Sequence, residues 1–467
     1  MSSGKPLALE VIILAAGRGT RMQSQLPKVL HLLAGKPLLA HVLDSVRTLK
    51  PKQIHVVCGF GSAQIREYFA ASDDINWVHQ KEQKGTAHAV QVALPDVTPD
   101  SNVLVMYGDV PLAGVSTLKS CVAYREDDPT PMRLVTSIPA TPFGLGRIIR
   151  DANDNICEIV EESDASESQK AVSEINTGIY FVSAKKLHQF LAGLTPHNAQ
   201  GELYLTDIVA AAVQQGIQIE CVVAENAEEF MGINDRIELA RSERYFQYRC
   251  ALNLLKAGVA LSDPARIDVR GQLSVGEDCF IDCNVVFEGE VVLGNGVTIE
   301  PGVVIRNSHI GDGVTIQANT VIEGARIANE CNIGPFARIR PGTELADKVK
   351  IGNFVETKNV RLGANTKASH LAYLGDARVG ADSNIGAGTI FCNYDGLNKH
   401  QTNIGDGVFV GSNSTLVAPI TIEDNAFLAA GSTLNKDVGE NELAVGRGKQ
   451  RNIKGWSPPA KQKVKEK

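Results

Sequence analysis

Aliphatic residues recur every six positions through most of the C-terminal half of the chain, and this period restricts its fold more than any other feature. The run from Ile404 to Leu434 keeps the six-residue step without exception, and the run from Val275 to Ile351 breaks it only with two five-residue steps. A period of six, with a small residue often following the aliphatic one, is typical of a hexapeptide β-helix. Each hexad forms a short strand and a turn, and three hexads close one coil. We therefore expect parallel coils whose inward aliphatic side chains stack into a continuous core.

Two interruptions break this period. In the segment 357–373, Ala368 stands where an aliphatic residue is expected, and the segment 391–403 (FCNYDGLNKHQTN) reads as an inserted loop. Because loops that leave a rigid solenoid often carry function, we expect functional residues at both places.

The N-terminal half has a different sequence pattern, in which apolar runs alternate with segments of helical periodicity. Segments 11–16, 54–58 and 102–107 read as buried strands, whereas the stretch after Pro37 and the segment 86–94 read as helices. This alternation predicts a largely parallel sheet with helices on both faces. Such sheets bind ligands at the carboxyl ends of their strands, so the functional residues are expected just after them.

The length of 467 residues suggests two or three domains. Residues 235–259 hold no Gly or Pro before Gly258 and read as one long helix. We therefore expect a first domain at 1–236, a linker helix at 237–257 and a β-helix domain at 258–467 with a basic C-terminal arm.

Charge and cysteine content exclude several classes of protein. The net charge of −7 gives no global reason to bind nucleic acid, and the longest apolar stretch near the start, 11–17, is too short to span a membrane. The nine cysteines are scattered without a CxxC pair or a metal-ligand spacing. Buried thiols in a reducing compartment are expected, and the cytoplasm is the expected location.

A glycine-rich turn follows the first predicted strand. Gly17 and Gly19 would let the backbone approach a phosphate group, and Arg21 and Lys28 would supply mobile cations for a triphosphate. The turn is neither a Walker A loop nor a GxGxxG motif, since no GK[ST] closes it and Met22 stands at the third glycine position.

The segment LAAGRGTRM with the following PKVL resembles the start of the sugar-phosphate nucleotidylyltransferases. Further matching segments are 80–89, 107–111 (YGDVP), 176–178 (NTG) and 201–207 (GELYLTD). Joined to a hexapeptide β-helix, residues 10 to 455 resemble the family of bifunctional bacterial N-acetylglucosamine-1-phosphate uridylyltransferases and glucosamine-1-phosphate N-acetyltransferases. The resemblance implies an α/β Rossmann-like nucleotidylyltransferase domain, a long linker helix and a left-handed parallel β-helix.

The resemblance implies that the N-terminal half transfers uridylyl from UTP to N-acetylglucosamine 1-phosphate, with Arg21 and Lys28 as catalytic cations. It places Mg²⁺ on Asp109 and Asn234, although Asp109 could simply form a turn and Asn234 could cap a helix. Glu161 lies in an acidic stretch that could face solvent. The implied UDP-N-acetylglucosamine site consists of Leu14, Ala15, Ala16, Gly17, Lys28, Gln80, Gly85, Thr86, Tyr107, Gly108, Asp109, Gly146, Glu161, Asn176 and Asn234.

The first interruption of the β-helix carries a candidate general base. Acetyl transfer to a sugar amine requires proton removal, and a histidine that titrates near neutral pH is suited to this. His370 lies where the hexad phase breaks, beside cations and before the inserted loop. A lone histidine is more often structural, but this position favours a catalytic role, and the resemblance assigns the base to the same residue.

The resemblance also implies ligand contacts in the β-helix. Arg340 could instead be a turn residue and Lys358 a surface lysine, and three of the acetyl-CoA positions could be ordinary small hexad residues. The sugar-phosphate site would consist of Arg340, Lys358, Tyr373 and Asn384, and the acetyl-CoA site of Ala387, Asn393, Tyr394, Ser412, Ala430 and Arg447.

Three hypotheses follow for the whole chain. The first is an enzyme with two active sites that makes UDP-N-acetylglucosamine from small-molecule substrates, for peptidoglycan and lipopolysaccharide, and assembles as a homotrimer through the β-helix. The second is a nucleotidylyltransferase with a single activity, whose β-helix only joins subunits. The third is a passive solenoid that binds a protein partner. His370, the loop at 391–403 and the basic arm favour the first.

Overall fold

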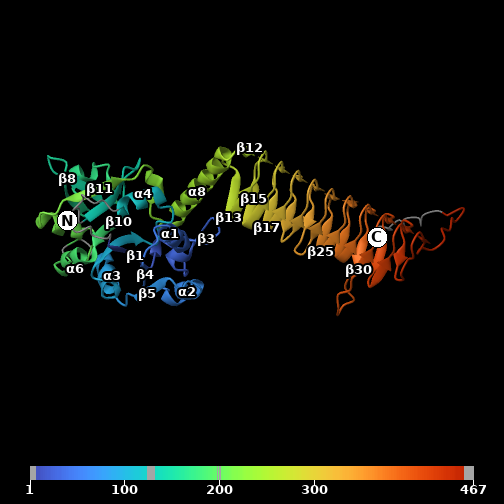
Figure 1. Cartoon of the computed structure of the whole chain (residues 1–467), viewed down its shortest axis with the longest axis horizontal. Helices are drawn as coiled ribbons and strands as arrows, with labels where there is room; N and C mark the ends of the chain where they lie inside the picture. The colour runs from blue at the N-terminus through green and yellow to red at the C-terminus, as the bar shows by residue number, and fades with distance from the viewer. Residues whose placement is uncertain (1–6, 124–131, 197, 199–200, 457–467) are drawn as a thin grey trace, which may run out of the picture. The chain divides into compact units, whose positions relative to one another are not determined.

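The structure is a computed structural model that describes residues 7–123, 132–196, 198 and 201–456 (Figure 1). Contacts divide the chain into two compact units, Met1–Cys250 and Ala251–Lys467. The long helix α8 (Arg236–Lys256) crosses this division, so the predicted long helix is confirmed. The expected domain bounds stay a prediction.

Parallel and antiparallel strands share one sheet in the first unit. In the described part its strands follow the order β11-β7-β10-β6-β1-β4-β5, with β8 paired to β10 and β9 paired to β8. The strands are β1 (Ala8–Ala15), β4 (Gln53–Cys58), β5 (Ile75–His79), β6 (Ser101–Tyr107), β7 (Met132–Ser137), β8 (Arg147–Arg150), β9 (Ile156–Val160), β10 (Ile175–Ser183) and β11 (Ile219–Val223).

Only half of this sheet has the predicted parallel arrangement. Strand β1 runs parallel to β4 and β6, but β10 runs antiparallel to both β6 and β7. A parallel return needs a crossover of a dozen or more residues, usually a helix. The chain between β7 and β10 instead forms the hairpin β8–β9 and the short helix α5.

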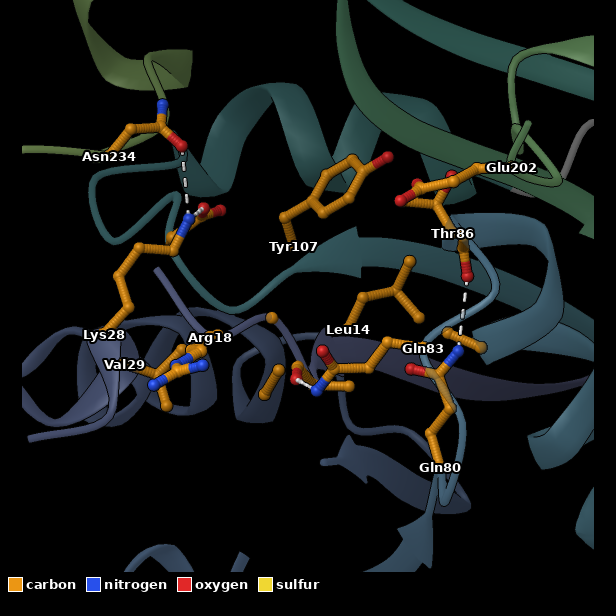
Figure 2. A pocket seen from close by; sticks show the side chains of 16 residues that line it. Leu14, Arg18, Lys28, Val29, Gln80, Gln83, Thr86, Tyr107, Glu202 and Asn234 are labelled. Atoms are coloured by element: carbon orange, nitrogen blue, oxygen red, sulfur yellow. Dashed lines mark hydrogen bonds and ion pairs between the residues drawn. The ribbon is translucent and has the colours of Figure 1, made fainter. Parts of the chain in front are cut away.

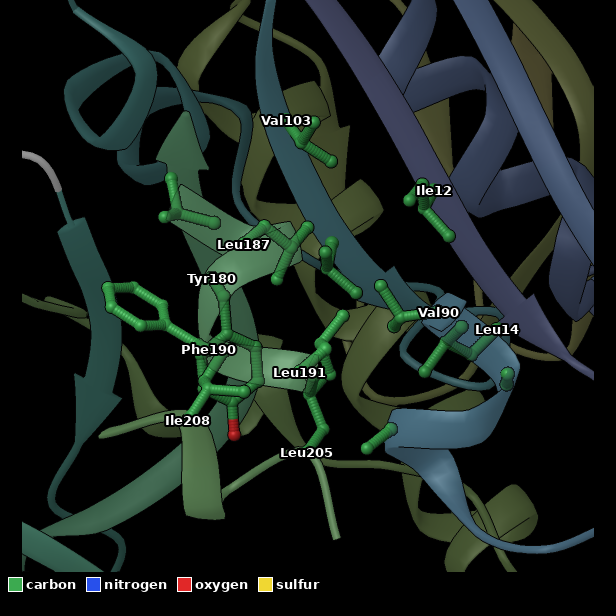
Figure 3. Close-up of a cluster of buried hydrophobic side chains, with 14 of the residues drawn as sticks. Ile12, Leu14, Val90, Val103, Tyr180, Leu187, Phe190, Leu191, Leu205 and Ile208 are labelled. Atoms are coloured by element: carbon green, nitrogen blue, oxygen red, sulfur yellow. The ribbon is translucent and has the colours of Figure 1, made fainter. Parts of the chain in front are cut away.

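Helices cover both faces of the sheet, as predicted. Ile12 and Leu14 of β1 pack with α3, α6 and α7 on one face (Figure 3), whereas Val11 and Ile13 pack with α1, α2 and α4 on the other. This alternation is the period-two pattern of a strand that is buried on both sides. The helices are α1 (Leu38–Arg47), α2 (Ser62–Tyr68), α3 (Thr86–Ala93), α4 (Val115–Val122), α5 (Glu167–Lys170), α6 (Ala184–Ala192) and α7 (Asp207–Gln214). Shorter elements are the 3-10 helices η1 (Thr20–Met22), η2 (Lys28–Leu30), η3 (Leu94–Asp96) and η4 (Ala227–Phe230), and the strand pair β2 (Leu32–Leu33) and β3 (Lys36–Pro37).

The second unit is the predicted parallel β-helix, in which strands of successive coils pair in register (Figure 1). One sheet contains β12 (Ala260–Leu261), β14 (Phe280–Ile281), β16 (Thr298–Ile299), β18 (Thr315–Ile316), β21 (Asn332–Ile333), β24 (Lys350–Asn353), β26 (Lys367–His370), β28 (Asn384–Ile385), β31 (Phe409–Val410), β34 (Phe427–Leu428) and β36 (Leu443–Ala444). The other contains β13 (Ile267–Val275), β15 (Val285–Leu293), β17 (Val304–Ile310), β19 (Val321–Glu323), β20 (Arg326–Ile327), β22 (Arg338–Ile339), β23 (Glu344–Leu345), β25 (Glu356–Leu362), β27 (Tyr373–Val379), β29 (Ile390–Cys392), β30 (Thr402–Ile404), β32 (Thr415–Val417), β33 (Ile420–Ile422) and β35 (Thr433–Leu434).

Inward side chains of these coils form the expected apolar core. Ile299, Ile316, Ile333 and Ile351 lie on successive coils and are fully buried. Each such side chain contributes about 1.5–3 kcal/mol by leaving water. At the first interruption Ala368 takes the inward position and is also fully buried, so the coil continues there with a smaller core residue.

A buried carboxylate joins the amino ends of two strands in the first unit. Glu10 of β1 accepts a hydrogen bond from His55 Nε2 of β4 at 2.9 Å and another from the amide of Thr98 at 3.3 Å. Burial acts to raise the pKa of Glu10, but the hydrogen bonds from Thr98 and His55 outweigh it and hold that pKa below its usual range. The folded protein therefore favours the ionised form of Glu10.

We expect Glu10→Gln to lower the free energy of unfolding by about 1.5–3 kcal/mol at pH 7, the range for a hydrogen bond to a charged group. Because the folded-state pKa is depressed, the ionised group stabilises the fold above its unfolded pKa of 4.5, and this contribution disappears as the pH falls through the folded value. Urea unfolding between pH 7 and pH 3 should therefore be less pH-dependent in the variant. Glu67→Gln, at an exposed position of α2, is the matched control. Equal pH dependence in wild type and Glu10→Gln would contradict this account.

Candidate active sites

A cavity of about 420 Å³ opens at the carboxyl ends of β1 and β6 in the first unit (Figure 2). Its position is the one that the strand pattern predicts, and most of the predicted nucleotide-site residues line it. The lining consists of Leu14, Ala15, Ala16, Gly17, Arg18, Lys28, Val29, Gln80, Gln83, Gly85, Thr86, Ala89, Tyr107, Asp109, Glu202 and Asn234.

The glycine-rich loop after β1 packs closely against its neighbours. Gly19 has φ +62°, and a Cβ there would lie 2.7 Å from Cβ of Lys28, so only glycine lets Lys28 approach this far. Gln83 Nε2 donates a hydrogen bond to the carbonyl of Ala16 at 2.8 Å. A Cβ on Gly59 would lie 2.8 Å from the same carbonyl oxygen. These contacts fix the loop along one wall of the cavity.

Three polar side chains converge at one end of the cavity (Figure 2). The ammonium of Lys28 contacts the carboxylate of Asp109 and donates to Oδ1 of Asn234 at 3.2 Å. The amide of Ile233 donates to the carbonyl of Asp109 at 2.9 Å, which ties the loop that carries Asn234 to the end of β6. A carboxylate oxygen and an amide oxygen thus already meet around a cation. Since Mg²⁺ prefers such hard oxygen donors, these residues fit a magnesium ion.

The side chain of Asn234 does not cap helix α8. The first amides of α8, those of Ile237 and Glu238, each donate to Oδ1 of Asp235 at 2.8 Å. Asp235 therefore caps the helix, whereas the side-chain oxygen of Asn234 faces Lys28 in the cavity.

The opposite wall of the cavity follows β5. Gln80 is buried, and its Nε2 donates to the carbonyl of Gly85 at 3.3 Å and lies 3.0 Å from Nδ1 of His88. Gly85 has φ +109°, and a Cβ there would lie 2.4 Å from the carbonyl oxygen of Leu203. The hydroxyl of Thr86 accepts from the amide of Leu205 at 2.9 Å. The segment 203–205 therefore braces this wall from behind.

Three residues of the predicted UDP-N-acetylglucosamine site, Gly146, Glu161 and Asn176, lie outside the cavity lining but adjoin one another. The amide of Asn176 donates to the carbonyl of Gly146 at 2.9 Å, and a Cβ on Gly146 would lie 3.3 Å from Oε2 of Glu161. Glu161 accepts from the hydroxyl of Thr206 at 3.4 Å, and burial raises the pKa of its carboxyl group. A carboxyl group in a desolvated position is suited to accept hydrogen bonds from sugar hydroxyls, and its burial argues against a solvent-facing acidic stretch. Gly108 follows β6 and donates its amide to the carbonyl of Leu14 at 2.9 Å.

The structure does not place every predicted cation in the cavity. Arg21 lies in η1 with an exposed side chain, and Arg18 lines the cavity instead, with its guanidinium 5.4 Å from the centre of the Phe60 ring. The catalytic role of Arg21 stays a prediction. Four further residues of the lining were not predicted from the sequence: Val29, Gln83, Ala89 and Glu202. All four stand within the matching motifs at 27–30, 80–89 and 201–207, which was a signal that could have identified them.

Three cations gather at the interruptions of the β-helix. Lys399 of the inserted loop and Arg340 after β22 both lower the pKa of Lys358 in β25, and Lys399 has the larger effect. Arg340 also donates to Glu356 at 2.7 Å. Cations held this close together are suited to bind a phosphate group. Arg340 and Lys358 were predicted from the sequence, and Lys399 was not, although its place in the inserted loop was a usable signal.

His370 ends β26, and its imidazole is hydrogen-bonded to the coil before it. Its Nδ1 lies 2.6 Å from Oδ1 of Asn353, the last residue of β24. The predicted site residue Asn384 begins the next strand, β28, in register with Lys367 of β26. Tyr373 begins β27, and a Cβ on Gly375 would lie 2.5 Å from its hydroxyl.

The predicted acetyl-CoA residues occupy one corner of successive coils and the inserted loop. The amide of Asn413 donates to Ala387 and that of Gly431 to Ser412, both at 2.7 Å, so these corners lie directly over one another. Arg447 donates to the carbonyl of Ala430 at 2.7 Å. In the inserted loop, the Asn393 side chain donates to the carboxylate of Asp376, and the exposed Tyr394 donates its hydroxyl to Gly396.

The described ranges contain no disulfide bond, no further metal site and no membrane-spanning helix. All nine cysteines are free, and burial raises the pKa of the Cys58 and Cys121 thiols to about 12, which makes them unreactive. In the same ranges no three His, Cys, Asp or Glu residues are grouped to hold a metal. None of the helices described there has the length and apolar character that a membrane crossing requires.

The fold and the first cavity define a nucleotidyltransferase domain that is joined to a hexapeptide-repeat β-helix. The MobA-like NTP transferase domain family matches residues 11–143. The GMPPB C-terminal domain family matches residues 269–370, and the hexapeptide repeat of succinyl-transferase matches residues 401–436.

Full-length relatives identify the family. The bifunctional protein GlmU of Idiomarina loihiensis is 52% identical over 457 residues, which cover 98% of this chain and 100% of that protein. The proteins of the same name from Marinobacter nauticus and Cellvibrio japonicus are each 52% identical over 453 residues, covering 97% of this chain and 99% of the relative. The chain belongs to the GlmU family of bifunctional proteins, as the sequence motifs predict.

Gly178→Ala should disrupt the first cavity from behind. Gly178 has φ +77°, and a Cβ there would lie 2.0 Å from the ring of Tyr107, which lines the cavity. Displacement of this ring should weaken binding of UTP with Mg²⁺ by roughly 10-fold, about 1.4 kcal/mol, in a calorimetric titration. Gly193→Ala is the matched control, because its Cβ would meet no atom within 4 Å. Unchanged affinity in Gly178→Ala would contradict a nucleotide site at Tyr107.

Proposed function

We propose that this protein makes UDP-N-acetylglucosamine in two steps, each in its own unit. The β-helix transfers acetyl from acetyl-CoA to glucosamine 1-phosphate, and the N-terminal unit then transfers uridylyl from UTP to the product and releases pyrophosphate. The observation that carries the proposal is that two chemically different polar clusters, around Asp109 and around His370, belong to separate units of a chain in the GlmU family.

In the first cavity the substrates supply the nucleophile. An oxygen of the sugar 1-phosphate attacks the α-phosphorus of UTP, the new P–O bond forms, and pyrophosphate leaves. Catalysis then depends on positioning and charge neutralisation. Lys28 and Arg18 are the cations that line the cavity, and Gln80 with Thr86 would bind the base. Mg²⁺ held by Asp109 and Asn234 would neutralise charge on the triphosphate.

At the β-helix, Arg340, Lys358 and Lys399 would hold the phosphate of glucosamine 1-phosphate. His370 would take the proton that the amine loses as it attacks the thioester of acetyl-CoA. Tyr373 and Asn384 would orient the sugar, and the corner of Ala387, Ser412 and Ala430 would lie along CoA, with Arg447 near its phosphates. Lys399 and Arg340 make the pairing of Lys358 with an anion favourable, because they crowd its positive charge.

UTP and acetyl-CoA are cytoplasmic metabolites, so we infer that the protein acts in the cytoplasm. The product is an activated amino sugar, and we infer that it supplies peptidoglycan and lipopolysaccharide synthesis. The alternative of a single nucleotidylyltransferase activity leaves the cation cluster and the hydrogen-bonded His370 without a role.

Two variants of the full chain test the division of labour. Asp109→Asn should remove most uridylyl transfer, because it weakens the oxygen donor set for Mg²⁺, and should leave acetyl transfer near normal. His370→Ala should lower acetyl transfer by roughly 10²–10⁴-fold, the usual effect of losing a general base, and leave uridylyl transfer near normal. Both activities are measured on each variant, by pyrophosphate release and by thiol release.

Each outcome decides one assignment. If Asp109→Asn transfers uridylyl at the normal rate at limiting Mg²⁺, the metal site lies elsewhere. If His370→Ala acetylates at the normal rate across neutral pH, His370 is structural. A chain that releases no thiol from acetyl-CoA with glucosamine 1-phosphate would support the single-activity alternative.

We further infer a homotrimer that forms through the β-helix and shares its acetyl-transfer site between subunits. A β-helix with three hexads per coil has three flat faces, and such prisms can close around a threefold axis. The inserted loop at 391–403 and the arm from Arg447 are longer than their own coils need. They could therefore reach a neighbouring subunit.

Subunit mixing tests the shared site. Inactive His370→Ala and inactive Arg447→Ala chains are unfolded, mixed and reassembled, and recovery of acetyl transfer is expected because some sites would combine intact residues from two chains. Wild-type protein taken through the same procedure controls for reassembly. No recovery despite active wild-type controls, or a fully active monomer in sedimentation, would reject the shared site.

A further inference from the structure

One pair of strands departs from the regular pattern of the β-helix. In the sheet that runs from β12 to β36, every strand has two residues except β24 (Lys350–Asn353) and β26 (Lys367–His370), which have four. These two strands are neighbours, and their register pairs Asn353 with His370. The departure therefore places one particular asparagine directly beside the proposed base.

A glycine allows this close approach. A Cβ on Gly352 would lie 1.9 Å from the carbonyl oxygen of Ser369, the residue before His370. The amide of Leu371 then donates to the carbonyl of Asn353 at 3.0 Å. The backbone on both sides of the pair is thus held in contact, and the Asn353 and His370 side chains face each other at a fixed separation.

The hydrogen bond between these side chains sets the tautomer of the imidazole. His370 Nδ1 lies 2.6 Å from Oδ1 of Asn353. An amide oxygen can only accept, so Nδ1 carries the hydrogen, and in the neutral ring Nε2 then has the free lone pair. His370 is exposed to solvent, so Nε2 is open to a substrate.

We propose that Asn353 is a positioning residue that orients His370 and holds it in the tautomer with Nε2 free to act as the base. The proposal rests on the proposed acetyl-transfer function. In that reaction the amine nitrogen bonds to the acetyl carbon, the carbon–sulfur bond breaks, and the amine proton moves to Nε2 and then to the departing CoA sulfur. The ring must therefore present a lone pair at Nε2 before the attack.

Few other charged groups lie on the strands packed against β26. Lys350 of β24 pairs in register with Lys367 of β26, three positions before His370. On the other side, β28 (Asn384–Ile385) adds no titratable side chain. Among the residues of β24 and β28, position 353 is the one that contacts the imidazole, so a charge introduced there acts on it directly.

Two substitutions separate positioning from mere structural support. Asn353→Asp keeps the acceptor oxygen and adds a negative charge beside Nδ1–H, which favours the protonated ring. The acid limb of the pH dependence of kcat for acetyl transfer should then move to higher pH by roughly one unit. Asn353→Ala removes the acceptor, and kcat should fall about 10-fold or more, with KM for acetyl-CoA unchanged.

A matched control lies one coil before Asn353 on the same sheet. Asn332 of β21 accepts from Gln317 Nε2 at 3.0 Å and has no histidine beside it in register. Asn332→Asp makes the same chemical change and should leave the acid limb where it is in the wild type. Nitrogen-15 NMR of the ring, assigned by the signal that His370→Ala loses, should show Nδ1–H in the wild type and a mixture of tautomers in Asn353→Ala.

The outcomes distinguish this inference from the function on which it rests. An acid limb that does not move in Asn353→Asp, or an Nε2–H tautomer in the wild type, overturns the role of Asn353 even if His370→Ala is inactive. A fully active His370→Ala instead overturns the proposed role of His370 itself. If Asn353→Ala fails to fold, as thermal unfolding would reveal, the Asn353→Asp profile and the wild-type tautomer still decide.

Discussion

In-register pairing of parallel strands is the constraint on which both sites depend. A parallel pair brings residues far apart in sequence to the same edge and holds them there through backbone hydrogen bonds. In the first unit, β1 pairs Leu14 with Tyr107 of β6, so the cavity begins where these strands end. In the β-helix the same pairing places Asn353 beside His370, one coil apart. Neither site requires a contact between the two units.

At the first site, the charge of Lys28 holds the polar side chains of Asp109 and Asn234 together. Lys28, Asp109 and Asn234 come from three distant segments, and the amide of Ile233 fixes the third to the second through the carbonyl of Asp109. A carboxylate that is partly removed from water needs a cation. Lys28 satisfies this need among the described residues, and a magnesium ion can satisfy it with the same oxygens. The arrangement therefore suits a reaction in which positive charge must be present when a triphosphate arrives.

The repeat period in the sequence predicted the β-helix. Strand direction and contacts between distant segments could not be predicted in the same way. The hexads from Ile404 to Leu434 determine the β-helix because a six-residue step has few other structural solutions. The antiparallel strand β10 was not anticipated, since a buried strand has the same apolar composition in either direction. Arg21, which follows both glycines of the loop, was predicted in the site, whereas Arg18, which lies between them, is the arginine that lines the cavity. The place of Lys399 in the inserted loop was a usable signal, but its proximity to Lys358 becomes visible only in the stacked coils, as does the hydrogen bond between Asn353 and His370.

The second site lies where the regular pattern of the β-helix is broken. Each two-residue strand of the sheet that contains β24 and β26 directs one side chain into the core and one outward, so the same arrangement repeats on every regular coil. The longer strands β24 and β26 end in corners where Phe354 and Leu371 adopt left-handed φ values of 56° and 51°, and both side chains are more than half exposed. Bulky residues in this conformation are strained, and strain persists where the surrounding structure fixes it. The paired coils provide that support, because Gly352 packs against Ser369 and the amide of Leu371 bonds to Asn353. The two lengthened strands therefore coincide with His370, which is exposed to solvent and hydrogen-bonded to an acceptor on the preceding coil.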